Sequence, residues 1–367
     1  MPVLHLTKLS PLLRTEVNDN RVFALIDLVN RPFIHRSFTH IVLFMTLLHP
    51  VNHFLAASVA PAINPYQLGA TLYMPATRQD IWQIISQQKL AEIDSIVICL
   101  EDAVSESEIP AALANLKQLL ATWAQHAQTH GFGDESRPIS PRASRPMVFI
   151  RPRNALMLTE LASWQTIALV DGFVLPKIDM QSLADWRLAC QALPSTQLLM
   201  PTLETRLIFN PIHNQELALA FSEGFSQSIL ALRIGGNDLF ASLRLRRPSD
   251  VTIYQTPVGI LIYQLIACFV PQGFYLTAPV FEYLDKPALF AEELRQDVAL
   301  GLVGKTIIHP EQIAAVKHAF YVNDIERSQA TAILAADAKA VFKQDNSMLE
   351  PATHRAWATS VMLRANV

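Results

Sequence analysis

Charged side chains stand at the ends of five consecutive short apolar runs of the sequence. They are Glu101, Asp102, Arg151, Lys177, Glu204 and Asp238. Charged residues rarely end a buried segment unless they are paired or bind a ligand. Because five runs in succession end in this way, with both signs of charge, the sequence predicts one shared site. A set of salt bridges at strand ends is the alternative interpretation.

The four carboxylates of this set would repel each other if they met without a cation, and one or more would take up a proton. A hard divalent ion relieves this repulsion. Mg²⁺ is typically held by one or two carboxylates, and substrate and water complete its octahedron. We therefore expect Mg²⁺ at this site, with Mn²⁺ as a possible substitute.

The basic residues and glycines of the same segments suit an anionic ligand. Arg151 can grip a carboxylate bidentately, and Lys177 can contact the substrate or pair with one of the acids. Gly235 and Gly236 allow a ligand to approach backbone N–H groups, although a turn with positive φ would also use glycine. Arg78 follows the first apolar run and is a further candidate anion ligand. Together these residues predict a metal ion and a small oxo-acid, whose enolate the metal would stabilise.

Short apolar runs alternate with amphipathic stretches after residue 65. The expected strands are 69–76, 95–102, 147–153, 172–177, 197–204, 229–236, 274–281 and 305–310. Nearly continuous apolar strands favour a parallel sheet that is covered on both faces. Eight β/α alternations predict an α/β fold, a (β/α)₈ TIM barrel over residues 65–322, with its active site at the strand carboxyl ends. An open doubly wound sheet is the alternative, but no G-x-G-x-x-G follows the first run.

Helical periodicity links these strands. The expected helices are 80–93, 110–127, 183–192, 214–225, 258–270 and 288–300. The polar segment 126–146 predicts a loop. Residues 323–367 have a helical composition and predict a C-terminal arm or subunit contact.

Residues 1–64 predict an N-terminal extension that is helical in part. Within it, residues 41–63 carry no Asp, Glu, Lys or Arg. Pro50 would break a membrane-spanning helix there, and a secretory signal would normally begin near the N-terminus with basic residues. A small-residue site at 58–60 keeps the signal interpretation open.

The composition narrows the class of partner. The formal net charge is −3, which gives no indication of a nucleic-acid partner. The three cysteines are far apart, so they predict reduced thiols rather than a disulfide framework or a zinc site. We expect a cytoplasmic protein that acts on a small molecule.

Six motifs along residues 67–322 carry a family resemblance. They are "SIVICLEDAV", "VFIRPRN", "GFVLPK", "MPTLET", "GGNDL" and "GLVGKTIIHPEQI". This series resembles the HpcH/HpaI aldolase superfamily, which includes the citrate lyase β-subunit and malyl-CoA lyase. "GATLYMPATR", "LRIGGNDL" and "TAPVFE" resemble a bacterial subgroup of C–C bond lyases of the TIM-barrel fold. The resemblance implies a Mg²⁺-dependent lyase or aldolase that cleaves a hydroxy acid or its coenzyme A thioester through a metal-stabilised enolate. It also implies a homo-oligomer, a trimer or hexamer.

The resemblance assigns roles to individual residues. Glu204 and Asp238 match the two metal-binding carboxylates, and Arg151 matches the arginine that binds the oxo-acid. Glu101 and Asp102 match the acidic pair that orders metal-bound water or holds the arginine. The amides of Gly235, Gly236 and Asn237 match those that take the substrate carboxylate. Gly304, Lys305 and His309 match the last-strand signature, whose role is partly structural.

Two departures from the family pattern keep other functions open. Ala278 and Pro279 stand where the lyases commonly carry Asp-Gly, and Glu282 lies nearby in the sequence. Segment 243–259 differs from coenzyme A lyases, and its short basic run could instead bind a phosphate or nucleotide. That run is Arg244, Arg246 and Arg247. The alternatives are a non-catalytic metal- and metabolite-binding component of a biosynthetic or stress-response assembly, and a phosphotransfer enzyme.

Overall fold

The computed structural model describes residues 63–130 and 145–367, which all belong to one compact unit, Ser58–Val367. The predicted N-terminal extension, apart from its last two residues, lies outside the described residues. Within the described ranges, no helix is both long and apolar enough to cross a membrane.

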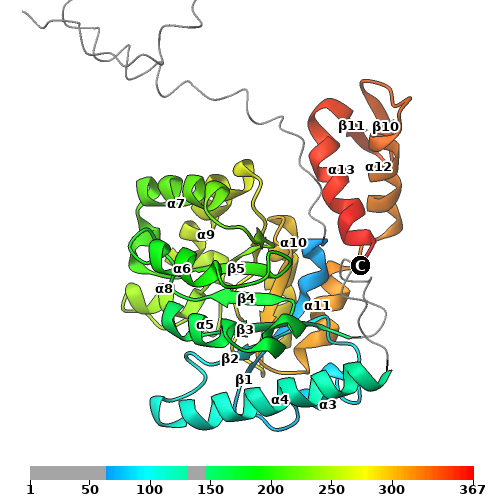
Figure 1. The fold of residues 1–367 in the computed structure, drawn as a ribbon. Coiled ribbons are helices and arrows are strands. Elements are labelled where there is room, and N and C mark those ends of the chain that lie inside the picture. The colour runs from blue at the N-terminus through cyan, green and yellow to red at the C-terminus, as the bar shows by residue number, and fades with distance from the viewer. Residues whose placement is uncertain (1–62, 131–144) are drawn as a thin grey trace, which may run out of the picture. The chain divides into compact units, whose positions relative to one another are not determined.

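Nine short strands form the central sheet (Figure 1). They are β1 (Gly69–Pro75), β2 (Ser95–Cys99), β3 (Met147–Arg151), β4 (Gly172–Leu175), β5 (Leu198–Leu203), β6 (Ser228–Ile229), β7 (Leu232–Ile234), β8 (Leu276–Thr277) and β9 (Gly304–Ile307). All their pairings are parallel, in the order β8-β7-β5-β4-β3-β2-β1-β9, and β6 adds to β5 beside β7.

The sheet closes between its two end strands. The Ala278 N–H donates to the Gly304 carbonyl at 2.8 Å, and the Val303 N–H donates to the Leu276 carbonyl at 2.9 Å. A parallel bridge also joins Ala278 to Lys305. Eight strand positions therefore form a parallel barrel, which confirms the predicted TIM-barrel fold.

The sixth expected strand differs from its prediction. Residues 229–236 were expected to be continuous, but β6 and β7 are separated at Leu230 and Ala231. The Leu230 N–H donates to β5 at Leu199, whereas the Leu232 N–H donates to Tyr275 on the other side, just before β8. The strand thus changes its hydrogen-bonding neighbour at this point, and it ends before Gly236, where α8 (Gly236–Ser242) begins.

Helices cover the outside of the barrel (Figure 1). They are α3 (Ile81–Ile85), α4 (Ile109–His130), α5 (Ala155–Ala162), α6 (Leu183–Cys190), α7 (Pro211–Glu223), α9 (Pro257–Phe269), α10 (Pro287–Ala299) and α11 (Gln312–Phe320). Single 3₁₀ turns supplement them: η3 (Pro65–Leu68), η4 (Glu106–Glu108), η5 (Gln165–Leu169), η6 (Arg206–Phe209), η7 (Ile253–Gln255) and η8 (Val270–Gln272). Several begin as their sequences predict; α9 has Pro257 at its first position, and the Thr256 side chain accepts from the Gly259 N–H.

Two helix boundaries correct the prediction. The helix expected over 80–93 ends at Ile85, because Gln87 and Leu90 adopt φ of 59° and 51° in the left-handed region, which a helix cannot contain. Helix α4 continues to His130, so the first five residues of the loop expected from His126 are helical.

Alternate strand residues face two different cores. On β3, Val148 and Ile150 pack with the helix layer, whereas Met147 and Phe149 pack inside the barrel. The barrel interior is apolar at this level. Arg151 is the next inward residue of β3, so the interior becomes polar at the carboxyl end, where the predicted site lies.

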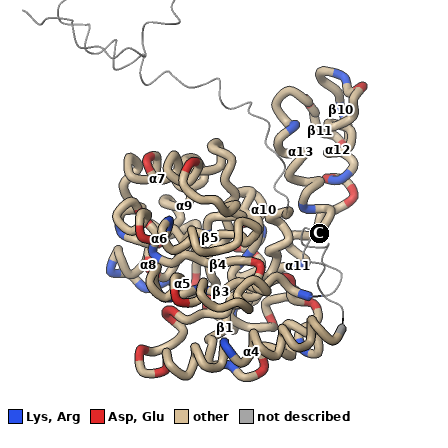
Figure 2. Tube along the Cα trace, viewed as in Figure 1, with Lys and Arg blue, Asp and Glu red and all other residues tan. Residues whose placement is uncertain are grey.

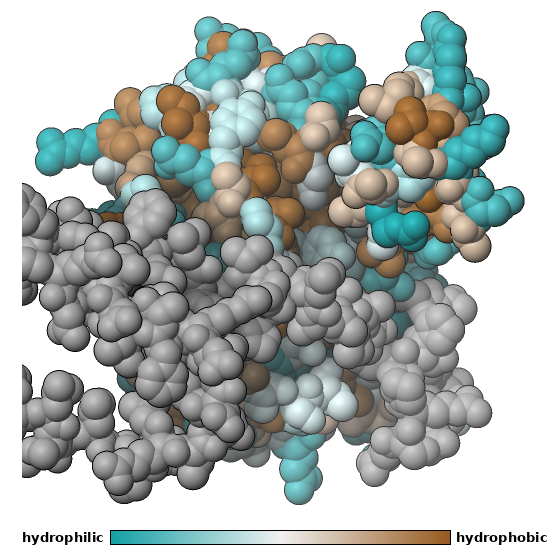
Figure 3. Space-filling view, turned by 90° about the horizontal axis from the view of Figure 1, so that it is seen from above, coloured by the Kyte–Doolittle hydropathy of each residue, from teal (hydrophilic) through white to brown (hydrophobic). Residues whose placement is uncertain are grey.

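The C-terminal segment is built of two helices and a hairpin. These are α12 (Asp324–Leu334), β10 (Phe342–Gln344), β11 (Ser347–Leu349) and α13 (Pro351–Ala365). A small apolar cluster of its own includes Ile333, Leu349 and Val361. Charges of both signs are distributed along the segment (Figure 2), and hydrophobic residues lie among hydrophilic ones on the face seen in Figure 3.

Candidate active site

Arg151, the last residue of β3, holds three carboxylates with one nitrogen. Its Nη2 lies 2.9 Å from Glu101 Oε2, 3.0 Å from Glu204 Oε1 and 3.4 Å from Asp102 Oδ2. Glu101 and Asp102 lie just beyond Leu100, the residue that follows β2, and Glu204 directly follows β5. The barrel therefore brings four of the predicted residues from three strand ends into direct contact.

Lys177, after β4, adds a second cation to the same acids. Its Nζ pairs with Glu101, lies 3.0 Å from Asp102 Oδ1 and lies 4.0 Å from Asp238 Oδ1. Its backbone N–H donates to Glu204 Oε1 at 2.8 Å. Lys177 has φ of 50°, a left-handed conformation that is uncommon for a residue with a side chain. The structure thus holds Lys177 in a strained turn that aims both its amide and its ammonium at the acids.

Glu204 and Asp238 interact closely enough for each to perturb the other. Burial raises the pKa of Glu204 to about 7; Arg151 acts against this rise, and the Asp238 charge adds to it. Burial also raises the pKa of Asp238, which lies in the first turn of α8, while Lys177 acts to lower it. Two neighbouring carboxyl groups that resist ionisation together are what a bound divalent cation would stabilise in the charged form.

Gly235 allows this arrangement. A Cβ on residue 235 would lie 2.2 Å from Glu204 Oε2 and 2.4 Å from Glu204 Cβ. A Cβ on Gly236 would meet the Pro279 side chain at 3.1 Å. The Gly235 N–H already donates to the Leu203 carbonyl at 3.2 Å, so it belongs to the sheet ladder rather than to the set of amides expected to face a substrate.

Asn237 and Glu282 meet beside the acids. The Asn237 side chain donates from Nδ2 to Glu282 Oε2 at 3.1 Å. Glu282 follows β8, on the same loop as Ala278 and Pro279. An acid of this loop, Glu282, therefore contacts Asn237, the residue next to Asp238.

Arg78 has no ion pair with this cluster among the described residues. Its Nη2 lies 3.1 Å from Asp80 Oδ2, and its Nε also pairs with Asp80. Lys89 approaches the same carboxylate at 3.1 Å. This local pair satisfies Arg78 at the start of the loop that precedes α3.

The basic run of residues 244–247 does not form one cationic patch. Arg244 and Arg246 are exposed, whereas Arg247 is buried. Arg247 pairs with Glu293 of α10 and donates to the Val280 carbonyl. Its charge is neutralised inside the protein, so it is not available to a phosphate.

The last-strand signature has a structural role. Lys305 on β9 is fully buried and lies 2.7 Å from Glu293 Oε1 and 2.9 Å from Asp297 Oδ2. His309 is half-exposed, and its backbone N–H donates to Gln312 Oε1 at 3.2 Å. These contacts attach β9 to α10 on the outside of the barrel and hold the loop that follows β9.

Arg233 is a buried arginine that the sequence interpretation missed. It lies at the centre of β7, between Leu232 and Ile234, which pack outward against the helices. Arg233 must therefore point into the barrel, where it donates to the Thr306 hydroxyl and lies over the Tyr73 ring. The sequence signal is the alternation of Arg233 with two apolar neighbours. Because Leu232 and Ile234 face the helices, Arg233 lies on the opposite face of the strand, which is the barrel interior.

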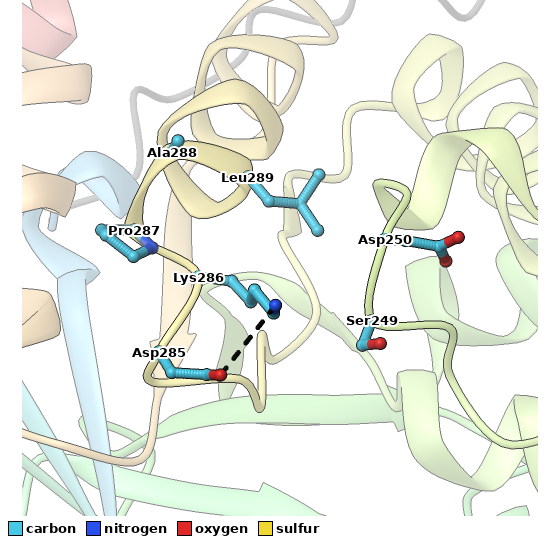
Figure 4. Close-up of a pocket in the computed structure, with 7 residues that line it drawn as sticks. All are labelled: Ser249, Asp250, Asp285, Lys286, Pro287, Ala288 and Leu289. Carbon is cyan, nitrogen blue, oxygen red and sulfur yellow. Dashed lines mark ion pairs between the residues drawn. The ribbon is translucent and has the colours of Figure 1, made fainter.

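A separate hollow lies away from the acidic cluster. A space of about 380 Å³ lies where α10 begins, lined by Ser249, Asp250 and Lys286 among others (Figure 4). Lys286 Nζ is 4.0 Å from the exposed Asp285. None of the residues at the strand ends lines this space, so it is separate from the acidic cluster.

The residues of the cluster fit Mg²⁺, which needs few protein ligands. Among the described residues, no group of three or more His, Cys, Asp or Glu side chains is arranged to hold a metal. Two carboxylates, Glu204 and Asp238, remain as the paired candidates. Mg²⁺ characteristically uses one or two carboxylates and fills its other positions with water or substrate.

Comparison with known proteins gives the family. The citrate lyase subunit beta-like protein of Deinococcus radiodurans is 26% identical over 284 residues, which cover 75% of this chain and 88% of that protein. The crystal structure of CitE from Mycobacterium tuberculosis, in complex with magnesium, acetoacetate and coenzyme A, has the same fold. It aligns with a TM-score of 0.57 at 20% identity, over 82% of this chain and 98% of that one. RipC from Yersinia pestis aligns with a TM-score of 0.50 at 18% identity, over 71% of this chain and 99% of that one.

The family match itself spans residues 62–367, which includes the whole barrel and the C-terminal segment. It agrees with the closed parallel barrel and with the motifs at its strand ends. The chain belongs to the family of C–C bond lyases of the TIM-barrel fold, a group of citrate lyase β-like enzymes.

Proposed function

We propose that this protein is a Mg²⁺-dependent lyase or aldolase that cleaves a hydroxy acid, or its coenzyme A thioester, to release an oxo-acid. The observation that carries the proposal is the meeting of Glu204 and Asp238 beside Gly235, with Arg151 and Lys177 around them. The magnesium, acetoacetate and coenzyme A in the structure of CitE from Mycobacterium tuberculosis support the same ligand classes here.

Glu204 and Asp238 would hold the metal. When bound, Mg²⁺ would polarise the substrate carbonyl and stabilise the enolate that forms as the carbon–carbon bond breaks. The two carboxylates come from the end of β5 and the start of α8, so the rigid barrel keeps their separation fixed before any ligand arrives.

Arg151 would bind the oxo-acid carboxylate. Its Nη2 is occupied by three acids, but its buried Nε has no hydrogen-bond partner in the described structure. A buried N–H without a partner costs stability, and a substrate oxygen would supply the missing acceptor. The acids hold the guanidinium plane in place while this donor remains available.

Glu101, Asp102 and Lys177 would orient the reacting groups. Burial opposes the charge on Lys177, but hydrogen bonds to Glu101 and Asp102 raise its pKa, so the ammonium keeps its proton. It can therefore balance the charge of the acids and of an incoming anion. Its contact with Asp238 places it beside the proposed metal ligand.

The test is Mg²⁺ binding by isothermal titration calorimetry. Asp238→Asn should abolish detectable binding, because it removes one of two charged ligands. Asp250→Asn, at the separate hollow of Figure 4, is the matched control and should bind as the wild type does. Unchanged Mg²⁺ binding in the Asp238→Asn variant would contradict the metal assignment.

A non-catalytic metabolite-binding barrel is the second candidate. The observation in its favour is the replacement of the family's Asp-Gly pair by Ala278 and Pro279. Turnover of a panel of hydroxy acids and their thioesters with Mg²⁺, lost in Arg151→Ala, would exclude it. We also propose that the protein is a cytoplasmic homo-oligomer. A mass measurement in solution would test the oligomeric state.

A further inference from the structure

His213 and Asn214 are two polar residues on the buried face of α7. Farther along the helix, the same face carries Leu217, Ala218 and Phe221, which pack in the core. Burial of a polar side chain costs free energy unless the side chain finds a hydrogen-bond partner, and an apolar residue would pack there without this cost. The partners of the two polar side chains therefore indicate what they do.

The start of α7 is capped by other residues. The Asn210 side chain accepts from the Ile212 N–H at 3.0 Å, and Pro211 stands at the first position of the helix. The helix thus has its own N-terminal cap without His213 and Asn214. Both of these side chains instead bond to loops at the carboxyl end of the barrel.

The bond from His213 reaches the loop after β4. His213 Nε2 accepts from the Met180 N–H at 3.2 Å, in the turn between Lys177 and α6. Inside this turn, the Asp179 N–H donates to Ser182 Oγ at 3.0 Å, and Ser182 Oγ donates to the Lys177 carbonyl at 3.3 Å. His213 therefore holds a turn whose own hydrogen bonds extend back to Lys177.

The bond from Asn214 reaches the loop after β5. Its Nδ2 donates to the Ile208 carbonyl at 2.8 Å, in η6, which begins two residues after Glu204. The two side chains also meet, since His213 Nδ1 lies 3.4 Å from Asn214 Oδ1. Because His213 Nε2 accepts a hydrogen bond, it carries no proton, and the ring N–H is at Nδ1, facing this oxygen. The two side chains thus form a bridge between the two loops in which donors match acceptors.

The bridge joins the backbone around Lys177 to the segment that follows Glu204, and these two residues contact each other directly. The Lys177 N–H donates to Glu204 Oε1 at 2.8 Å. Lys177 adopts φ of 50°, and such a conformation persists only where the surrounding structure holds it. Its ammonium is carried on a flexible stem, so its place among the acids depends on where the turn sets the backbone.

We propose that His213, together with Asn214, is a positioning residue of the candidate active site. The bridge holds the turn after β4 against the loop after β5. It thereby keeps the Lys177 amide on Glu204 and the Lys177 ammonium among the acids. This inference rests on the function proposed above, which gives Lys177 and Glu204 their roles.

The test compares two substitutions that differ by one methylene group. In His213→Gln the amide oxygen reaches the place of Nε2 and can accept from the Met180 N–H, whereas the side chain of His213→Asn is too short. Hydrogen–deuterium exchange, resolved to single residues by mass spectrometry, follows the amides of Met180 and Lys177. His213→Asn should speed exchange at both amides by at least about fivefold, the order expected when one hydrogen bond is lost. Faster exchange at Met180 alone would overturn the proposal.

Ligand binding gives a second readout that a purely structural role would not change. Pyruvate is the probe, titrated by calorimetry at saturating Mg²⁺. His213→Asn should weaken pyruvate binding by at least about fivefold, and His213→Gln should stay within about twofold of the wild type. Unchanged affinity in a folded His213→Asn variant overturns the proposal. Absence of pyruvate binding from the wild type would contradict the oxo-acid site proposed above, and amide exchange would still decide the role of His213.

Gln227→Leu is the matched control for a buried amide elsewhere. The Gln227 side chain donates to the Cys190 carbonyl at 2.9 Å, at the other end of α6. Its loss should lower the unfolding temperature but leave pyruvate affinity and exchange at Lys177 unchanged. Thermal unfolding establishes that each variant folds. If His213→Asn does not fold, faster exchange at Lys177 in a folded His213→Gln variant overturns the proposal, because that variant keeps the acceptor.

Discussion

At the residue scale, the absence of a side chain at Gly235 leaves the space that the Glu204 carboxylate occupies. The two residues stand on neighbouring strand positions, one step beyond the paired Leu203 and Ile234. Any Cβ at residue 235 would occupy the space of the Glu204 carboxylate. The carboxylate of Glu204 is in turn held by Arg151 and by the Lys177 amide. The position of this carboxylate thus depends on a glycine, a guanidinium and a strained turn.

Gly235→Ala should weaken Mg²⁺ binding by at least about tenfold, because the added methyl group must displace a carboxylate that we assign to the metal. Calorimetry of the folded variant measures this change. Gly236→Ala is the control: its Cβ would meet the apolar side chains of Pro279 at 3.1 Å and Ile253 at 3.5 Å, so its effect should be smaller. Equal effects in the two variants would contradict the role of the close approach.

At the element scale, a buried ion network fixes the loops beside the site. Glu293 on α10 binds Arg247 and Lys305, and its Oε2 accepts from the Ile253 N–H at 2.9 Å. Asp297, one turn later, accepts from the Tyr254 hydroxyl. The network joins the segment before α9, the loop after β8 and strand β9. Because that loop also carries Glu282, the network helps to position the acid that reaches Asn237.

Glu293→Gln should destabilise the protein by about 3–5 kcal/mol, since it leaves two buried cations with one acid between them. Denaturant-induced unfolding followed by circular dichroism measures this loss. Glu292→Gln is the matched control on the same helix. Its partner Arg295 is largely exposed, so the control should cost less than about 1 kcal/mol. A similar loss of unfolding free energy in both variants would contradict the larger contribution expected from the buried network.

At the scale of the whole described molecule, the C-terminal segment contributes to the core of the barrel. Leu363 of α13 packs against the interior cluster that includes Tyr66 and Leu68, and the Asn64 side chain donates to the Leu363 carbonyl at 2.6 Å. The opposite, carboxyl end of the barrel carries the acidic cluster. Stability and binding are therefore served by different ends of the same fold, as is usual for TIM barrels.

Leu363→Ala should lower the free energy of unfolding by about 1–2 kcal/mol through lost burial, and it should leave Mg²⁺ affinity unchanged. Thermal unfolding and calorimetry provide the two measurements. Val367→Ala, at an exposed position, is the control and should change neither. A loss of Mg²⁺ affinity in Leu363→Ala would show that the two ends of the barrel are coupled.

The sequence by itself determined the barrel and most of its charged site. Apolar runs of strand length set the eight strand positions, and the rule that parallel strands carry function at their carboxyl ends selected residues such as Arg151 and Glu204. The fold prediction is confirmed, and the charged side chains lie together, because both inferences need only local patterns and one general topology. The functional roles of these side chains stay predictions. The tertiary structure alone decided which charges meet. It separated Arg247 from Arg244 and Arg246, paired Arg78 with Asp80, and turned Arg233 inward without an acid. Such contacts depend on strand register and side-chain burial across the barrel, and the order of residues along the chain does not contain them.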